Sequence, residues 1–502
     1  MSSESLIAVI LLAPLAAVLL CLLVQRPRPA EFFNLAAAVV VFLAVLALLP
    51  HSLSGPQRLA DDYLIVDALS TWGLLCVASV YLLSSIYAIG YMRRLSEDAR
   101  LHRFYALFAG FALTTLSGPL MNNVGVYWIA IELTTLVSTF LVCFELGAES
   151  IEAAWKYLVI VSAGISLALL GTVLYYWAGS FALGPSYSLT WAALREVAPR
   201  LDPAIATTAF LLVTIGFGTK VGLAPMHTWL PDAHSEGPAP VSAMLSGALL
   251  NTAMIGIARF LQVSDAAGSG ALPRAAVVAL GAFSLFVAAL FIVRQTGIKR
   301  LMAYSSVEHM GVLALGFGFG GPLGIAGALY HMLNHSLNKS LMFFGAGNAM
   351  RAYGSKRIGA IRGLPTRMPV SGWLWLAGAV AITGAPPFGL FRSELTVLRA
   401  GLRSDHAWAV YLMLVLLIVI FVGFLAHFRA MYFERAPAAA EELQSEEDIE
   451  RAQPLRDFPD AWCVVPMALA LIPLLALGLW WPDFFARCFA AVAANLSVGG
   501  RS

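Results

Sequence analysis

Long apolar stretches dominate the chain, and short polar or proline-containing segments separate them. A membrane-spanning helix needs about 20 mostly apolar residues. A backbone amide at membrane depth must be hydrogen-bonded inside the protein, so such stretches are expected to be helices. The pattern predicts an all-α polytopic membrane protein of about fourteen transmembrane helices, at residues 5–25, 33–50, 66–92, 104–120, 123–144, 151–177, 204–229, 238–263, 274–293, 299–319, 323–349, 370–398, 408–432 and 462–485.

The loops between these spans predict how the chain crosses the membrane. Loops after the odd-numbered spans carry most of the Lys and Arg residues, Arg93, Arg94 and Lys356 among them. Basic loops stay in the cytoplasm, which places both termini outside, as expected in a bacterial inner membrane. The first span follows MSSES, which has an acid and no base, so we expect it to be uncleaved rather than a signal peptide.

No loop is long enough for a soluble catalytic domain, so residues 1–502 are expected to form a single membrane domain. The longest loop, 433–461, is predicted to be cytoplasmic and holds the acidic run EELQSEEDIE. This run is either a solvated linker or a docking segment for a partner subunit.

Composition supports lipid as the main solvent. Of 502 residues, 60% are hydrophobic and 12% are charged, about half the charged fraction of a soluble protein. The net charge of +2 offers no basic surface for nucleic acid. The five cysteines are isolated, whereas an iron–sulfur cluster needs clustered thiolates. We therefore expect no metal and no cofactor in this chain.

Ionisable side chains nevertheless interrupt the predicted spans. A charge at the bilayer centre costs at least about 2.5–3.5 kcal/mol, so such residues pair, face water or serve a function. Those that stand inside the spans are Glu132, Lys156, Lys220, Arg259, Glu308, His309, His331, His335, Lys339, Arg392 and Glu394.

Glu132 lies deep in the fifth span and is predicted to be a functional carboxylate paired with Lys156 or Lys220. Lys156 opens the sixth span, where a side chain that reaches back to the membrane surface is an equal alternative. Arg259 ends the eighth span and is interpreted as an interfacial anchor. Glu308 and His309 lie a third of the way into the tenth span, where they could bridge the two halves of the chain.

Prolines interrupt the seventh span after Lys220, at Pro225, and the twelfth span at Pro386 and Pro387. Broken helices at membrane depth line cavities and mark transport sites. Two such breaks predict two inverted five-helix repeats, spans 4–8 at 104–263 and spans 9–13 at 274–432. The polar residues after the first break form either the entrance to a pathway or only a polar loop: His227, Asp232, His234 and Glu236.

His331, His335 and Lys339 recur every four residues in the eleventh span. Four residues turn a helix by about 400°, so the three side chains share one face. Because histidine titrates near neutral pH, a water-bridged row of this kind can conduct protons. Two alternatives are ligation of a b-type haem and polar contacts that hold helices together.

Three strings in the chain resemble a known family. KVGLAPMHTWLPDAHSEGPAPVSAMLSG, IKRLMAYSSVEHMG and HMLNHSLNKSLMFFGAGN resemble the proton-translocating, antiporter-like subunits of complex I, Mrp-type antiporters and group 4 membrane-bound hydrogenases. The strings IELTTL and PPFGLFRSEL look most like the component F branch of the hydrogenase-4 proteins.

This resemblance implies which residues carry the function. The family's carboxylate in span five corresponds to Glu132, and its lysine in broken span seven corresponds to Lys220. The polar residues of span eleven correspond to the His331 row, and the end of span twelve to Arg392 or Glu394. Several complex I members have a lysine in span eight, where this chain has Asn251.

The function implied is that of a proton-translocating subunit in a redox-driven pump, with electron transfer in partner subunits. Two other functions stay open. One is a sodium/proton antiporter subunit of Mrp type, and the other is the membrane subunit of an inorganic-carbon uptake complex.

Overall fold

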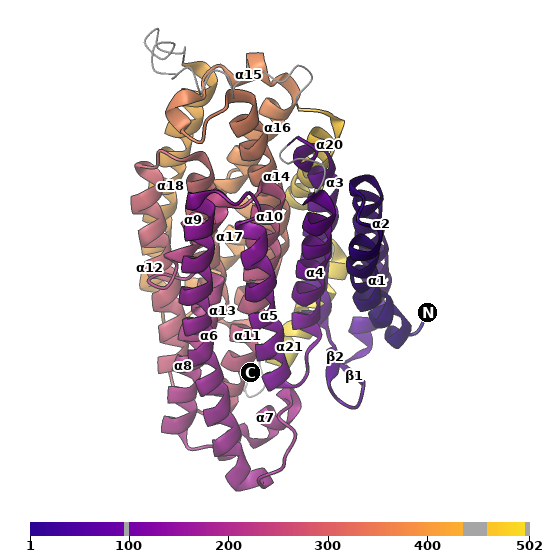
Figure 1. The fold of residues 1–502 in the computed structure, drawn as a ribbon. Helices are drawn as coiled ribbons and strands as arrows, with labels where there is room; N and C mark the ends of the chain where they lie inside the picture. The colour runs from indigo at the N-terminus through magenta and orange to yellow at the C-terminus, as the bar shows by residue number, and fades with distance from the viewer. Residues whose placement is uncertain (95–99, 435–458, 497–502) are drawn as a thin grey trace.

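The computed structural model describes residues 1–94, 100–434 and 459–496 and shows a bundle of long helices (Figure 1). The helices of its first half are α1 (Ser3–Val24), α2 (Pro27–Leu48), α3 (Ala68–Met92), α4 (Leu101–Leu120), α5 (Val124–Val142), α6 (Ala148–Leu183), α7 (Trp191–Val197), α8 (Pro203–Val221), α9 (Trp229–Glu236), α10 (Ala239–Met244) and α11 (Leu250–Ala266).

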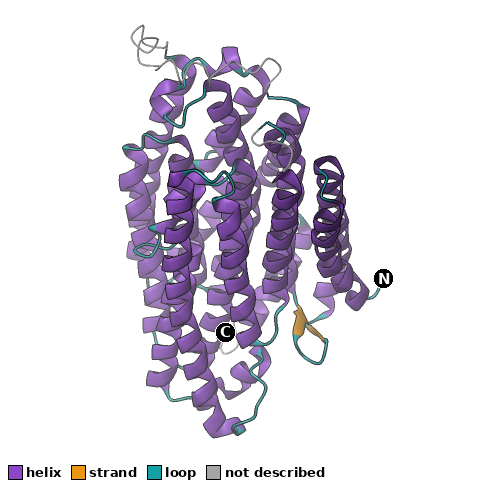
Figure 2. Ribbon diagram, viewed as in Figure 1, coloured by secondary structure: helices purple, strands orange, loops and turns teal. Residues whose placement is uncertain are grey.

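The second half contains α12 (Leu272–Val293), α13 (Ile298–Phe319), α14 (Gly321–Tyr353), α15 (Leu364–Arg367), α16 (Pro369–Ile382), α17 (Gly389–Gly401), α18 (Ala407–Phe433), α20 (Ala461–Leu479) and α21 (Asp483–Leu496). Short 3₁₀ turns lie at Leu49–Ser54, Ala198–Arg200 and Ile358–Ala360. Strands β1 (Gln57–Leu59) and β2 (Leu64–Val66) pair antiparallel, with Arg58 opposite Ile65, in a small hairpin before α3 (Figure 2).

The prediction of an all-α polytopic membrane protein is confirmed. Among the described residues, ten helices are long and apolar enough to cross a membrane. Large apolar side chains cover the outside of the bundle; Ile418 and Tyr411 of α18, for example, are both 64% exposed. The other predicted spans correspond to α4, α13, α14 and the α16–α17 pair. The total of fourteen stays a prediction.

The helix α14 lies at the centre of the bundle. Its residues from Gly327 to Ala349 are all buried, although they include histidines, asparagines and a lysine. The helices packed around it include α3, α13, α16, α17 and α20. The approach to α16 is close, because a Cβ on Gly345 would lie 2.1 Å from the Trp375 ring. The polar residues of α14 therefore face protein rather than lipid.

Both predicted helix interruptions are present. Helix α8 ends at Val221, and Gly222 follows in a left-handed conformation (φ 80°) that favours glycine. The chain resumes a helix only at α9. Helix α16 ends at Ile382, and Gly384 (φ +66°) begins the turn that precedes α17. In addition, residues Leu245–Leu249 form a π-helical turn between α10 and α11 that the apolar pattern did not reveal.

The last predicted span, 462–485, is shorter than expected, because α20 ends at Leu479 and a separate helix, α21, follows. The acidic run of the loop 433–461 lies outside the described residues.

The interpretation of Arg259 as an interfacial anchor is wrong. Its guanidinium is buried and makes two parallel hydrogen bonds of 2.9 Å to the carboxylate of Asp67, which precedes α3. It also donates to the Ser70 hydroxyl at 2.9 Å. The residue thus ties α11 to the start of α3.

We predict that Arg259→Met lowers the free energy of unfolding by about 3–5 kcal/mol, because it leaves the Asp67 carboxylate buried without its partner. Denaturation in detergent micelles measures the change. Arg429→Met is the matched control, since Arg429 pairs with Glu434 on the surface and should change stability by at most about 1 kcal/mol. Equal stability of the Arg259 variant and the wild type would contradict the assignment.

Candidate functional site

A first polar cluster joins α5, α6 and α8. The Lys220 ammonium is fully buried in the last turn of α8. It donates hydrogen bonds to the Thr135 hydroxyl at 2.7 Å and to the Tyr157 hydroxyl at 2.9 Å. The Tyr157 hydroxyl is also 2.8 Å from that of Ser138. Lys220 is therefore held by neutral hydroxyl groups on two neighbouring helices.

Glu132 reaches this cluster through Thr135. Its carboxylate accepts hydrogen bonds from Ser162 at 2.6 Å and from Thr135 at 3.5 Å. Thr135 lies three residues after Glu132 on the same face of α5, so one hydroxyl contacts both the acid and the base. The result is a continuous chain, Glu132–Thr135–Lys220–Tyr157.

The end of α8 is fixed by the residues after its break. The Trp229 indole donates a 2.7 Å hydrogen bond to the carbonyl of Thr219, and its ring packs 4.7 Å from that of Tyr157. Helices α6 and α8 lie very close, because a Cβ on Gly216 would meet the Ala168 nitrogen at 2.4 Å. These contacts keep the lysine next to the two hydroxyl groups.

A second polar cluster follows α14. His331, His335 and Lys339 are fully buried on one face of this helix, as predicted. The Lys339 ammonium donates to the Met302 carbonyl at 3.0 Å and to the Ser305 hydroxyl, both on α13. A ring nitrogen of His335 lies 3.3 Å from the Ser246 carbonyl in the π-helical turn.

His331 lies between two other helices. Its Nε2 is 3.0 Å from Nδ1 of His309 on α13, and its Nδ1 is 2.9 Å from the Ser393 hydroxyl on α17. A haem iron ligated by these two facing nitrogens would need them roughly 4 Å apart, at metal–nitrogen distances of about 2 Å. Their 3.0 Å contact is a direct hydrogen bond instead.

Two buried carboxyl groups border this row. Glu308 of α13 and Glu394 of α17 each have one oxygen without a hydrogen-bond partner among the described residues. The sequence left open whether Arg392 or Glu394 belongs to the site. Glu394 packs against Gly384 at the helix break, whereas Arg392 stacks 5.3 Å from the ring of Trp481. His309, His331 and Glu394 are also close enough for one metal ion, with ligand atoms within 4.8 Å of one another.

Asn251 links α11 to α14. Its amide nitrogen donates to the Ser336 hydroxyl at 2.9 Å and to the carbonyls of Met332 and Gly247, at 3.2 and 3.1 Å. Its amide oxygen is buried without a partner. Asn251 therefore lies beside the histidine row and helps to position α14, the helix that carries this row.

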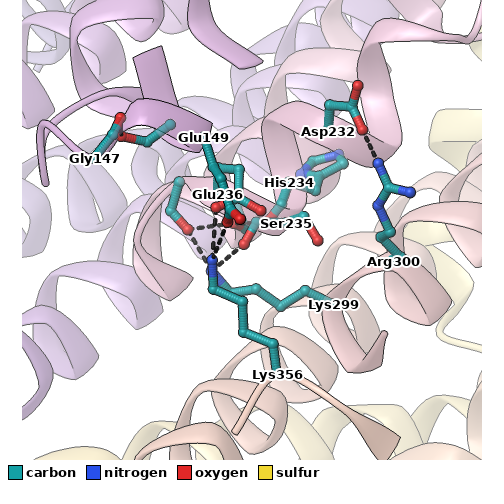
Figure 3. Close-up of polar contacts among 12 residues, drawn as sticks. Gly147, Glu149, Asp232, His234, Ser235, Glu236, Lys299, Arg300 and Lys356 are labelled. Atoms are coloured by element: carbon teal, nitrogen blue, oxygen red, sulfur yellow. Dashed lines mark hydrogen bonds and ion pairs between the residues drawn. The ribbon is translucent and has the colours of Figure 1, made fainter. Parts of the chain in front are cut away.

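Three of the polar residues after the first break, Asp232, His234 and Glu236, lie in α9, where both acids pair with basic side chains (Figure 3). Lys356 bridges Glu236 and Glu149, with N–O distances of 2.7 and 3.3 Å. Burial lowers the pKa of the Lys356 ammonium, but the hydrogen bonds and charges of these two acids outweigh it, so the pKa is raised. Lys299 donates to the carbonyls of Ser235 and Gly237.

A cavity of about 810 Å³ opens beside this group of charges, and its lining includes Ser235, Glu236, Lys299 and Lys356. His234 is fully buried next to Ser235, and neither of its ring nitrogens has a hydrogen-bond partner in the described part of the chain. His227 is buried against the ring of Tyr304.

Lys156 does not join the buried clusters. Its ammonium pairs with Glu152 at 2.5 Å and lies 3.9 Å from Asp232, which also bonds Arg300. The side chain is 37% exposed, which fits the alternative of a residue that reaches the surface. Of the two cations considered as partners for Glu132, only Lys220 shares a hydroxyl with it.

Several residues of the two clusters were not identified from the sequence: Thr135, Tyr157, Ser162, Ser246, Ser305 and Ser393. Only Thr135 gave a usable signal, through its helical spacing from Glu132. The others are ordinary hydroxyl residues until the packing shows which helix they face.

Proteins of known family resemble this chain in sequence. Residues 121–421 match the family described as NADH:quinone oxidoreductase/Mrp antiporter, TM. The chain is 36% identical over 401 residues to the hydrogenase-4 component F homolog of Methylacidiphilum infernorum, covering 78% of this chain and 82% of that one. It is 31% identical over 360 residues to NADH-quinone oxidoreductase subunit N of Desulforudis audaxviator, covering 70% and 69%.

Solved structures share the fold. A chain of the archaeal membrane-bound sulfane sulfur reductase superposes with a TM-score of 0.84 at 21% identity, covering 97% of both chains. A chain of the Mrp complex from Dietzia gives 0.84 at 20% identity, covering 99% of this chain and 98% of that one. The chain therefore belongs to the family of antiporter-like membrane subunits found in NADH:quinone oxidoreductases, hydrogenase-4 and Mrp complexes.

Proposed function

We propose that this chain is a proton-translocating membrane subunit of a multisubunit, redox-driven complex. The observation that carries the proposal is the buried Lys220. The Thr135 hydroxyl links it to Glu132, and the Tyr157 hydroxyl accepts a hydrogen bond from it directly. A lysine can release its proton, unlike an arginine. Electron transfer would take place in partner subunits, consistent with relatives that are named as components of hydrogenase-4 and quinone oxidoreductase.

The proposed pathway has three parts. Protons enter near His227 and His234 from the charged end of the bundle, where Lys156 lies at the surface. The Glu132–Lys220 chain receives them, and the row of Lys339, His335 and His331 passes them across α14. Glu394 is the exit group. Asn251, Glu308 and His309 support the row, and Arg392 lies beside the exit.

Trp229 lies between the first cluster and His234. Its ring is 4.7 Å from that of Tyr157 and 6.5 Å from that of His234. No direct hydrogen bond in the described residues joins the two clusters, so water molecules would have to complete the pathway there. A bridging water molecule gives nearly as favourable an enthalpy as a direct hydrogen bond between the same two groups.

We also propose that residues 104–263 and 274–432 form the two inverted repeats. A buried or half-buried glutamate stands in the second helix of each, Glu132 in α5 and Glu308 in α13. A titratable residue flanks each helix break, Lys220 before one and Glu394 after the other. In the same proposal, the basic loops face the cytoplasm of a bacterium and both termini lie outside its inner membrane.

We predict that Lys220→Ala and Glu132→Gln each reduce proton uptake about a hundredfold or more, the usual contribution of an essential proton-transfer group. The assay is uptake by vesicles that contain the assembled complex, with assembly checked by size-exclusion chromatography. Arg429→Met, on the surface of α18, should retain uptake. Wild-type pumping in both pathway variants would overturn the proposal.

A second variant pair tests the hydroxyl link. Thr135→Val removes the group that contacts both Glu132 and Lys220 while keeping the shape of the side chain, so uptake should fall. Thr135→Ser restores the hydroxyl and should recover most of it. If Thr135→Val and Thr135→Ser show the same proton uptake, the Thr135 side chain contributes only packing and the proton takes another route.

The coupled ion is tested by replacing sodium with potassium in the same vesicles. We expect no change in proton uptake, because the Lys220 ammonium already occupies the oxygens of Thr135 and Tyr157 in the first cluster and repels a second cation. A strict requirement for sodium would favour a sodium/proton antiporter instead.

A further inference from the structure

Three side chains of metal-ligand type converge at the centre of the second cluster. His309 comes from α13, His331 from α14 and Glu394 from α17, and each offers a ligand atom within 4.8 Å of the other two. All three side chains are buried. Three helices thus bring two imidazoles and one carboxylate to a single point.

The spacing of the two imidazoles suits a small cation. His309 Nδ1 and His331 Nε2 face each other at 3.0 Å. Ligand atoms around a tetrahedral zinc ion, with Zn–N bonds of about 2.0–2.1 Å, stand roughly 3.3 Å apart. A slight separation of the rings would therefore replace their mutual hydrogen bond with two coordinate bonds.

The orientation of His331 is already set by a neighbouring hydroxyl. Ser393 donates its proton to the Leu390 carbonyl at 2.8 Å, so its oxygen accepts from Nδ1–H of His331. This leaves the His331 Nε2 lone pair directed at His309. Histidine ligands in metal sites are held in the same way by a partner on their second nitrogen.

The other two groups have unpartnered atoms in the described structure. Oε1 of Glu394 is a free ligand oxygen, and Nε2 of His309 is free to hold a proton. The unpartnered Nε2 can take the proton that Nδ1 must give up to bind a metal, so the change of tautomer releases no proton. The rings of His335 and His309 are 5.2 Å apart, which leaves His335 or a water as a fourth ligand.

The ligand types and charges favour a divalent cation of the zinc class. Two imidazoles and one carboxylate form an open zinc site in several enzymes, whereas magnesium and calcium prefer oxygen ligands. The carboxyl groups of Glu308 and Glu394 offset the positive charge of the bound cation. The Lys339 ammonium, in the following turns of α14, repels the cation.

We propose that His309, His331 and Glu394 form a binding site for Zn²⁺. The occupied site would hold both histidines and stop proton transfer along the row. The block of proton transfer rests on the proposed function, whereas metal binding itself does not.

The test is equilibrium dialysis of the purified full-length chain against Zn²⁺, with X-ray absorption of the bound metal. We expect one equivalent with nitrogen and oxygen ligands at about 2.0–2.1 Å and no sulfur at about 2.3 Å. His309→Ala and the shape-conserving Glu394→Gln should lose this equivalent. Ser393→Ala should weaken binding about 10–100-fold through its effect on His331.

His51→Ala is the matched control, because His51 lies in a 3₁₀ turn outside the second cluster, where its ring bonds the Ala47 carbonyl at 3.1 Å. It should bind like the wild type. Retention of the metal in both His309→Ala and Glu394→Gln, sulfur ligation, or no binding by the wild type would overturn the proposed site.

Glu132→Gln separates the two proposals, since it lies in the first cluster. This variant should lose proton uptake but keep its zinc equivalent. If Glu132→Gln and Lys220→Ala both bind zinc and still pump normally, the proposed function fails and the metal site stands. If Glu132→Gln stops pumping while the wild type binds no zinc, the metal site fails and the proposed function stands.

Discussion

Everything in this structure depends on one constraint: polar groups at membrane depth must find their partners inside the protein. Helix α14 shows how the constraint is met. Its histidines and lysine bond to carbonyls, hydroxyls and a ring nitrogen on α13, α17 and the π-helical turn. The apolar helices at the edge of the bundle shield these contacts from lipid, so the polar row becomes the core of the molecule.

Close packing of the helices brings these polar groups within hydrogen-bonding distance of one another. Glycines such as Gly216 and Gly345 let neighbouring helices approach until a single methyl group would not fit. The two helix breaks have a related effect. At each break the chain leaves the helical path, and a titratable side chain, Lys220 or Glu394, lies beside residues from other helices.

The two polar clusters are built differently. Hydroxyl groups surround the lysine of the first, and they can both donate and accept a hydrogen bond. Paired imidazoles and carboxyl groups form the second, and several of their ring nitrogens and oxygens lack partners among the described residues. In the proposed function, the first arrangement would hold a proton on a defined path, whereas the second has ring nitrogens and oxygens free to bind water or a cation. The two clusters thus differ in their chemistry.

Local patterns predicted the long helices, both breaks, the burial of Lys220 and the shared face of His331, His335 and Lys339, because apolar runs, prolines and helical spacing are local properties. Which helix faces which became known from the packing alone. It showed that Lys156 and Arg392 point away from the clusters, that Arg259 pairs with Asp67, and that Ser393 orients His331. Such pairings join residues far apart in the chain, and their distances depend on packing, which no local pattern encodes.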